Sequence, residues 1–474
     1  ICSILNETQI KKIHESSVYL LERIGVVIPH EEMLNRLEEA GAHVDRKRQM
    51  VYFNEELIQD SLAKAEKKFV LFGRDISRTA TYAYGNRNFS SISGEGYWID
   101  RPGGERRFAS LADVATACKF GENLDGLSVV GAMSDPFEIP VEYRCVAVLA
   151  EMLRNTTKPV THWFHNRKTA TYLVEIILAL RGNQKIAQQY PLLAYSLEPI
   201  SPLRFPFDGV DLLFEIAKLK IPIGAAPMAQ MGATAPMSIA GTIIQQNAEI
   251  LAAICVAQTV HPGTPILYCG TCHAIDMRTT QMIFGGPEQV IFGVALTQMG
   301  RHYGLPVSVN VGLTDSKRVD AQAGLEIGMT LLTAAAAGAC AFGLQGICGV
   351  DQAAFLDMLV LQNEIASYVE SAMRQLDFSD EALGLDVIER VGPGGTFIDN
   401  EHTAKHLRKE LWMPRLLDRD FSDTWRNAGA KSMEERCAER REQLLNAHPT
   451  PPLSSDIERS LNDIVKSAKR NLAP

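Results

Sequence analysis

The chain has 474 residues, of which 46% are hydrophobic and 22% are charged, and its formal net charge is -9. This length allows one large domain with additions or two to three smaller ones, and the apolar content is enough for a sizeable core. The acidic balance argues against nucleic acid as a partner, because proteins that bind nucleic acid contact its phosphates through basic patches.

The chain carries no signal for a membrane or for export. It has no run of about 18 apolar residues without polar breaks, and its first residues lack the basic-then-apolar order of a signal peptide. Its nine cysteines are an odd number and stand mostly in apolar contexts, which fits reduced, buried thiols better than a disulfide framework. We therefore expect a cytoplasmic protein with no membrane partner.

Residues 1–109 are predicted to form N-terminal helices and a β-hairpin that pack on the rest of the chain. Apolar residues recur at helical spacing in Glu7–Ile24 and Glu31–Ala40. The turn Pro102–Gly104 separates two runs with strand character, which predicts the hairpin. The expected strands are Met50–Phe53, Phe69–Gly73, Phe89–Asp100 and Glu105–Phe108.

Residues 110–376 alternate between strand and helix patterns. The strand candidates are Leu127–Ala132, Pro159–Phe164, Leu192–Leu197, Ile221–Ala226, Pro265–Cys269, Val307–Val311 and Cys340–Leu344. The helical segments are Pro140–Arg154, Lys168–Arg181, Val210–Lys218, Ser238–Thr259, Pro287–Tyr303 and Ala321–Ala337. This alternation indicates an α/β fold with a parallel sheet covered by helices. Seven strands, with an eighth not placed, predict a TIM (β/α)8 barrel; a doubly wound sheet is the alternative, which the lack of a Gly-x-Gly-x-x-Gly helix start weakens.

Residues 377–474 differ from the barrel in character and are predicted to form a C-terminal helical extension. A Gly392–Gly395 turn is followed by charged helical segments, and residues 433–472 have the pattern of an exposed amphipathic helix. We expect this extension to pack on the barrel or on a partner subunit, and we expect the protein to be a homo-oligomer.

In a barrel of this kind, the chemistry lies at the carboxyl ends of the strands. Each aromatic residue there has an ordinary interpretation as rim packing, and Thr314-Asp315-Ser316 has one as a turn and helix cap. Together, several aromatics and few nucleophiles predict a pocket that holds a cation against ring faces. The polar and aromatic residues near strand ends are Met133, Asp135, His162, Trp163, His165, Tyr195, Glu198, Met228, Gln230, Tyr268, Thr271, His273, Asn310, Thr314, Asp315, Lys317, Gln345, Asp351 and Phe355.

The motif Cys269-Gly-Thr-Cys272-His273 matches the haem attachment pattern, but its place at a strand end without an export signal argues against haem. A zinc site on Cys269, Cys272 and His273 is the stronger rival. Zinc sites usually show a second ligand cluster at fixed spacing, and none is evident, so no zinc is expected. The absence of a G-x-S-x-G elbow, a P-loop and an H-E-x-x-H leaves hydrolase, nucleotidase and zincin functions without support.

Several motifs together resemble the trimethylamine methyltransferase family. They are Gly94-Glu95-Gly96, Gly286-Pro287-Glu288, Thr314-Asp315-Ser316-Lys317 with Asp320–Gly324, and Val391–Gly395 with His402-Thr403. The similarity covers nearly the whole chain in the same order of segments. The founding members carry pyrrolysine, and this sequence has no pyrrolysine letter. It therefore resembles the non-pyrrolysine branch, which includes glycine betaine:corrinoid methyltransferases.

The resemblance implies a methyltransferase that moves a methyl group from a quaternary, glycine betaine-like amine to a Co(I) corrinoid (cobalamin) carried by a separate corrinoid protein. A quaternary amine already has a neutral leaving group, so no acid, base or covalent residue is expected. Two rival functions are a zinc-dependent methyltransferase acting on a thiol or alcohol, and a betaine-binding barrel without turnover. The residues expected to form a cation cage are Tyr97, Trp98, Trp163, Tyr195, Tyr268 and Phe355. The residues expected to contact the polar part of the substrate are His162, His165, Thr271, His273, Asn310, Lys317 and Gln345.

Overall fold

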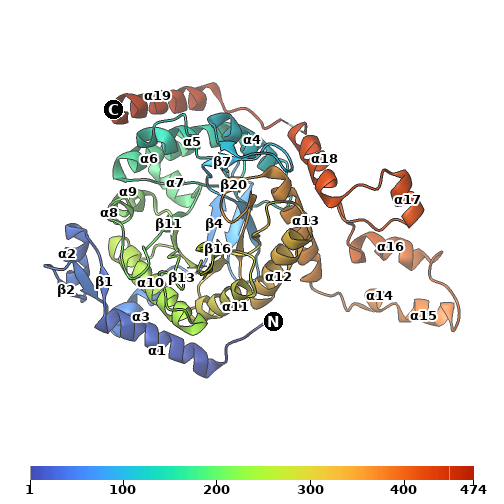
Figure 1. Cartoon of the computed structure of the whole chain (residues 1–474), viewed down its shortest axis with the longest axis horizontal. Helices are drawn as coiled ribbons and strands as arrows, with labels where there is room; N and C mark the ends of the chain where they lie inside the picture. Colours follow the sequence, from blue (N-terminus) through green and yellow to red (C-terminus); the bar gives the residue numbers. More distant parts are fainter. Residues whose placement is uncertain (1, 448, 474) are drawn as a thin grey trace.

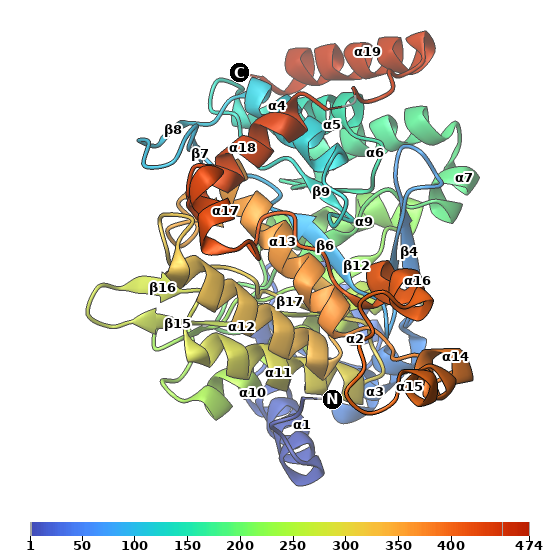
Figure 2. The same cartoon turned by 90° about the vertical axis from the view of Figure 1, so that its right-hand side faces the viewer.

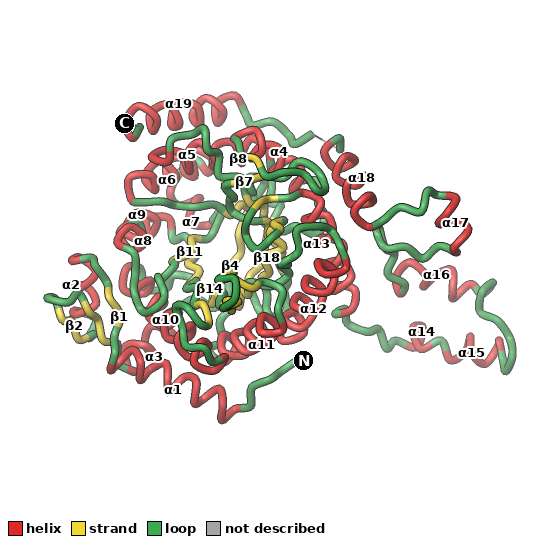
Figure 3. The backbone as a smooth tube through the Cα atoms, viewed as in Figure 1, coloured by secondary structure: helices red, strands yellow, loops and turns green. Residues whose placement is uncertain are grey.

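The computed structural model describes residues 2–447 and 449–473. Its centre is a closed barrel of eight short parallel strands within a ring of helices (Figures 1 and 3). The ladder runs from β6 through β18, β17, β14 and β12 to β11. It closes through a Val160 N–H···O=C Leu192 bond of 3.4 Å and a bridge between Ser90 and Val129. The strands are β6 (Asn88–Ser91), β9 (Val130–Gly131), β10 (Val160–Thr161), β11 (Tyr195–Leu197), β12 (Ile223–Ala225), β14 (Ile266–Gly270), β17 (Val307–Val309) and β18 (Ala341–Gln345).

A helix or a pair of helices follows each barrel strand, which confirms the predicted TIM barrel. Polar side chains begin several of them: Asn166, Ser238 and Asp320 each accept a backbone N–H of the first helical turn. The barrel helices are α4 (Leu111–Glu122), α5 (Val141–Asn155), α6 (Arg167–Arg181), α8 (Phe207–Asp211) with α9 (Leu213–Ile216), α10 (Ile239–Val260), α11 (Pro287–His302), α12 (Ala321–Ala337) and α13 (Leu356–Ala372). The short α7 (Gln184–Gln189) precedes β11, and the 3-10 turn Ala217–Leu219 follows α9.

The strand that the sequence left unplaced is β6, which pairs in parallel with β18. The sequence pattern predicted Phe89–Asp100 as one strand of an N-terminal hairpin, because this run precedes the turn at Pro102. In the structure, only the end of that run, β7 (Tyr97–Trp98), forms the hairpin with β8 (Arg107–Phe108). The barrel therefore begins before residue 110, and the predicted boundary separates its first strand from its second.

The N-terminal segment covers one side of the barrel and one of its ends. Helices α1 (Glu7–Arg23) and α3 (Glu55–Lys64) pack on α10, beside a small sheet and α2 (Glu31–Glu39) (Figure 1). The hairpin of β4 (Phe69–Phe72) and β5 (Thr79–Tyr82) closes the amino-terminal end of the barrel, where Leu71 and Tyr82 pack against Val129, Leu267 and Cys340. The small sheet consists of β1 (Val26–Val27), β2 (His43–Asp45) and β3 (Met50–Tyr52).

The loops at the carboxyl end of the strands carry further small strands, and we call this end the mouth. Figure 2 shows the β15–β16 and β7–β8 hairpins on one side of the molecule and β4 on the other. The mouth strands are β7 and β8, β13 (Gln230–Met231), β15 (His273–Asp276), β16 (Gln281–Ile283), β19 (Ile347–Cys348) and β20 (Ala353–Ala354).

The C-terminal extension packs on the barrel at its end and projects outward in its middle. Helix α19 (Ser455–Leu472) lies along α5 and α6, and α18 (Met433–Leu445) lies on α13 and α4 (Figure 1). Residues 377–430, which we call the arm, extend away from the barrel. The arm contains α14 (Asp380–Leu383), α15 (Leu385–Val391), α16 (Glu401–Glu410) and α17 (Ser422–Asn427).

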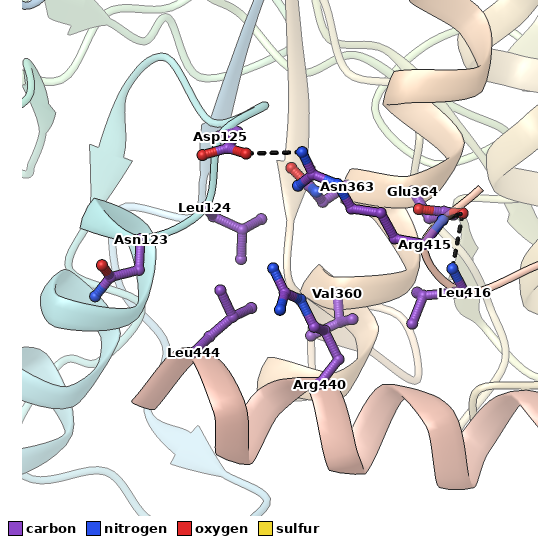
Figure 4. A pocket seen from close by; sticks show the side chains of 10 residues that line it. All are labelled: Asn123, Leu124, Asp125, Val360, Asn363, Glu364, Arg415, Leu416, Arg440 and Leu444. Carbon is purple, nitrogen blue, oxygen red and sulfur yellow. Dashed lines mark hydrogen bonds and ion pairs between the residues drawn. The ribbon is translucent and has the colours of Figure 1, made fainter. Parts of the chain in front are cut away.

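Polar contacts fix the returning end of the arm to the barrel, as Figure 4 shows. One carboxylate oxygen of Glu364 accepts the backbone N–H groups of Arg415 (2.8 Å) and Leu416 (3.0 Å). The Arg415 guanidinium lies 2.8 Å from Asp125. The gap among these residues is only about 10 Å³ in volume, which leaves no room for a ligand. These residues form the contact between the arm and the barrel.

Helix α10 is the one helix in the described residues that is long and apolar enough to cross a membrane. Its apolar window is 78% buried inside the fold, between the barrel strands and helices α1, α3 and α11. Tertiary packing therefore accounts for its composition.

Candidate active site

A cavity of about 670 Å³ runs along the barrel axis, a size typical of small-molecule sites. At one end it reaches Leu71 and Tyr82 of the β4–β5 hairpin; at the other, the mouth loops line it. TIM barrel interiors are usually filled by bulky branched side chains. Here many inward positions are small, and this leaves the space open. These positions include Ser90, Ala194, Ser196, Ala226, Ser308, Ala341 and Gly343.

Three carboxyl groups line the cavity, and none of the lining side chains within the described residues is Lys or Arg. Glu95 follows β6 and Asp351 follows β18, two strands that pair directly. The two carboxyls are hydrogen-bonded to each other; burial first, then this bond and the charge of Asp351, raise the pKa of Glu95. Glu95 therefore keeps its proton at neutral pH.

The third carboxyl, Glu198, follows β11. Burial inside the barrel raises its pKa to about 7, although its side chain is exposed to the cavity. No hydrogen-bond donor or cation pairs with it in the part of the chain that the structure covers. A cation entering the cavity would supply the missing counter-charge.

An amide network crosses the wall of the cavity near the mouth. The amide nitrogen of Gln345 donates to Asn310 Oδ1 (2.9 Å), and Asn310 Nδ2 lies 3.0 Å from His273 Nε2. Burial lowers the pKa of His273 to about 4, so its ring is neutral and Nε2 accepts the bond. These contacts orient Asn310 and Gln345 along the cavity wall.

Backbone strain accompanies the loop that supplies Gln345 and Asp351. Both residues have positive φ values, 55° and 57°, as does Val350 at 62°. Such conformations in residues other than glycine cost of order 1–3 kcal/mol each and cluster at functional sites. The loop thus holds two lining side chains in place at a cost in stability.

Residues 1–473 match the trimethylamine methyltransferase family. The chain belongs to this family. It is 32% identical over 469 residues to a glycine betaine methyltransferase of Desulfitobacterium hafniense (strain Y51), with 98% of this chain and 96% of the relative covered. It is 29% identical over 465 residues to a trimethylamine methyltransferase of Desulfitobacterium hafniense (strain DSM 10664 / DCB-2), covering 98% and 93% of the two chains. A trimethylamine methyltransferase of Methanosarcina barkeri is 28% identical over 477 residues, covering 98% and 94%.

The structure of this family member brings four of the predicted site residues to the cavity. They are Trp163, Thr271, Asn310 and Gln345. The Trp163 ring lies beside the backbone of Gly94, where an added Cβ would stand 3.2 Å from Nε1. Among the described residues, Trp163 is the one member of the predicted aromatic cage that lines the cavity.

The other five cage candidates do not line the cavity, so the prediction that these rings cluster into a cage is wrong. Tyr195 and Tyr268 are on barrel strands but point outward into the helix layer, where their hydroxyls bond to Gly209 O and Asn247 Oδ1. Side chains alternate along a strand, and the inward positions beside them are Ser196 and Cys269. Trp98 and Phe355 are buried in the core, and Tyr97 is on the outer face of the mouth.

The predicted polar contacts divide in a similar way. His162 points outward, 2.8 Å from Cys145 O, and burial lowers its pKa to about 4. His165 does not line the cavity, and Lys317 bonds to Asp315 O at the surface. His273 supports Asn310 from behind and does not itself line the cavity. Thr314 and Asp315 form a turn held by Glu326, and the cap of α12 is Asp320.

Several lining residues were not among the predicted site residues. Glu198, Asp351, Met228 and Gln230 were recognised as residues near strand ends, but they were not assigned to the substrate site. Glu95 could have been found as the acid in the Gly94–Gly96 motif. Phe284 follows β16 and lies against the His273 ring, with centroids 4.7 Å apart; it reaches the cavity because a hairpin folds over the mouth, which no local pattern indicates.

The proposed zinc ligands do not form a common site. The described residues contain no group of three or more His, Cys, Asp or Glu side chains placed to hold a metal ion. Cys269 lines the cavity, Cys272 is fully buried, and His273 Nε2 is occupied by Asn310. Burial raises the pKa of both thiols, which opposes the thiolate form that zinc needs.

Proposed function

We propose that this protein transfers a methyl group from a quaternary, glycine betaine-like amine to the Co(I) corrinoid of a partner corrinoid protein. The observation that carries the proposal is the acidic cavity in a chain that matches a methyltransferase family over residues 1–473. A quaternary amine keeps its charge at every pH, and a cavity lined by carboxyl groups without Lys or Arg favours such a cation over neutral or anionic ligands.

Each part of the cavity has a role in this reaction. Trp163 offers a ring face to the ammonium group, a contact worth about 0.5–2 kcal/mol. Glu198 and the Glu95–Asp351 pair supply negative charge, while Asn310 and Gln345 offer amide donors to a polar substituent such as a carboxylate. The walls exclude water and aim one methyl group at the mouth.

The acceptor supplies a strong two-electron nucleophile. As the new bond to the methyl carbon forms, the C–N bond breaks and its electron pair stays on nitrogen, which leaves a neutral tertiary amine. No proton transfer or covalent protein intermediate is required, in agreement with a cavity whose one lining thiol, Cys269, is kept neutral by burial.

The setting follows from the same features. We propose a cytoplasmic location, because all nine cysteines are free and eight are buried. We also propose a homo-oligomer in which a second copy covers the arm. The arm exposes many large apolar side chains, and α14–α16 lie on the β4 side of the molecule, away from the mouth (Figure 2). The most exposed of these side chains are Phe378, Leu385, Ile398, Met413 and Phe421.

The direct test is a screen of amines with reduced cob(I)alamin. The purified protein is expected to form methylcobalamin, followed by its absorption spectrum, with a quaternary amine and not with trimethylamine. Glycine betaine, carnitine, proline betaine and choline cover the substituents that the cavity could accept. Failure of every quaternary amine to methylate the cobalamin would contradict the proposal, as would stoichiometric zinc whose removal abolishes turnover.

A further inference from the structure

Three exposed aromatic rings form a ladder on the outer face of the mouth. Tyr97 of β7 stacks on Phe108 of β8 with centroids 5.1 Å apart, and Phe108 stacks on Phe137 at 4.5 Å. The Arg106 guanidinium lies 4.9 Å above the Tyr97 ring and caps the ladder. The three rings are 38%, 53% and 64% exposed. Rings of this size are normally buried, and a contiguous exposed set marks an interaction surface.

The ladder is joined directly to the cavity wall. Tyr97 follows the lining residue Glu95 by two positions, and Asp135, just before Phe137, donates its backbone N–H to Glu95 O at 2.7 Å. Arg106 also lies 3.3 Å from Gln352, the neighbour of Asp351. The rings therefore extend the rim of the cavity outward on the side where β6 and β9 end.

A second apolar group belongs to the loops after β12 and β14. Met237 and Met277 are each 62% exposed, and their sulfurs lie close to Gly232, at 2.7 and 3.3 Å from the position of an added Cβ. Met228, which lines the cavity, is 42% exposed. Methionine side chains adapt to varied partners and recur on binding surfaces. Apolar residues thus stand on loops from two separate parts of the barrel end.

We infer that the ladder of Tyr97, Phe108 and Phe137, with Met237 and Met277, is the docking surface for the protein that carries the corrinoid acceptor. This inference rests on the proposed function. The methyl acceptor has to reach the cavity through the mouth, so its carrier has to sit on this rim. A second copy of the chain bound here would close the cavity, whereas the arm offers a separate surface for self-association.

The test compares two acceptors for the same enzyme. The protein acceptor is the corrinoid protein of the source organism that the wild-type enzyme methylates fastest. In the variant Phe108→Ser/Phe137→Ser, the KM for this acceptor is expected to rise at least about tenfold, which corresponds to the loss of about 1.4 kcal/mol of binding free energy. The rate with free cob(I)alamin is expected to stay unchanged, because no cavity residue is altered. The matched control Tyr19→Ser/Tyr368→Ser removes two rings that are 61% and 51% exposed on α1 and α13 and should alter neither reaction.

Three outcomes would overturn the inference. They are an unchanged KM for the corrinoid protein, an equal loss with both acceptors, and a shift of the variant to a smaller oligomer in sedimentation, which would make the ladder a contact between copies. A wild-type enzyme that methylates neither acceptor would instead contradict the proposed function itself, so the two failures can be told apart.

Discussion

Alternation along the barrel strands decides which residues can reach a substrate. On and after β10, Thr161 and Trp163 face the cavity while His162 points to α5. On β11, Ser196 faces inward and Tyr195 outward. Neighbouring residues on a strand face opposite sides, so a side chain one position away from a cavity-lining residue points into the helix layer. Aromatic residues near strand ends therefore could not be assigned to a cage from composition alone.

Trp163 is the residue whose ring face can be tested most directly. Replacement by alanine is expected to raise the KM for the quaternary amine about 2- to 30-fold, which corresponds to the loss of about 0.5–2 kcal/mol of cation–π energy. Trp163→Phe should retain most of the affinity. Trp412→Ala, in the arm and outside the cavity lining, is the control. Equal KM values for Trp163→Ala and wild type would remove this ring from the binding site.

Glu198 predicts a pH dependence of substrate binding. Its pKa of about 7 means that the carboxyl is mostly protonated at pH 6 and mostly ionised at pH 8. Because the ionised form attracts a cation, the KM for the amine is expected to fall by up to about tenfold between pH 6 and pH 8. Measurement with free cob(I)alamin isolates this effect from partner docking.

The variant Glu198→Gln should flatten that profile. It is expected to have, at every pH, a KM similar to or above that of wild type at pH 6, because the neutral amide cannot supply the charge. A wild-type KM that rises with pH, or a Glu198→Gln variant with the wild-type profile, would be evidence against a role for this carboxylate in binding the cation.

At the scale of elements, buried charges hold the C-terminal helices to the barrel. Asp357 in the first turn of α13 is fully buried and lies 2.9 Å from Arg441 of α18. Arg441 also donates to the carbonyl of Asp100 in the β7–β8 connection (3.1 Å). Burial raises the pKa of Asp357 to about 6 in spite of the arginine. One ion pair therefore connects the last part of the chain to the mouth.

Arg441→Met is expected to lower the free energy of unfolding by about 3–5 kcal/mol at pH 8, because it leaves a buried carboxylate without its counter-charge. The raised pKa of Asp357 decides how this loss changes with pH. Below about pH 6, the folded protein binds more protons at Asp357 than the unfolded chain does. The penalty should therefore be smaller at pH 5, where the carboxyl is neutral. Urea unfolding at both pH values measures this difference.

Gln443→Met, an exposed position on the same helix, is the control for that experiment and should change stability by less than about 0.5 kcal/mol. A loss in Arg441→Met that is the same at pH 5 and pH 8 would mean that lost packing, rather than the unpaired charge, explains the effect.

At the scale of the whole molecule, the two ends of the barrel have separate uses. The mouth carries the cavity opening and the aromatic ladder, while α14–α16 of the arm lie toward the β4 side (Figure 2). In the described arm, only Val387 and Leu416 are buried apolar residues, so the arm has almost no core of its own. Self-association through the arm would leave the mouth free for a carrier protein.

Light scattering is expected to show an oligomer for the full chain. The variant Ile398→Asp/Phe421→Asp, at two positions that are each 89% exposed, should shift it toward monomer and keep turnover with free cob(I)alamin. A wild-type monomer at micromolar concentration, or an oligomer that both substitutions leave intact, would exclude the arm as the contact.

The order and type of the main elements could be derived from the chain alone. Seven barrel strands and six helical segments lie where hydrophobic patterns and turn residues predicted them, because these signals act over a few neighbouring residues. The parallel barrel follows from their alternation. Most of β6 was predicted as a strand within Phe89–Asp100, but it was not assigned to the barrel because its partner, β18, is about 250 residues away in the sequence.

The composition of the site depended on the tertiary structure. Glu95 and Asp351 meet because the first and last strands of the barrel pair, and Phe284 arrives on a hairpin that folds over the mouth. The cavity exists because inward positions on several separate strands are all small, and each position looks ordinary in its own segment. These contacts between residues far apart in the sequence depend on barrel closure and strand register, which arise only when distant segments pack together.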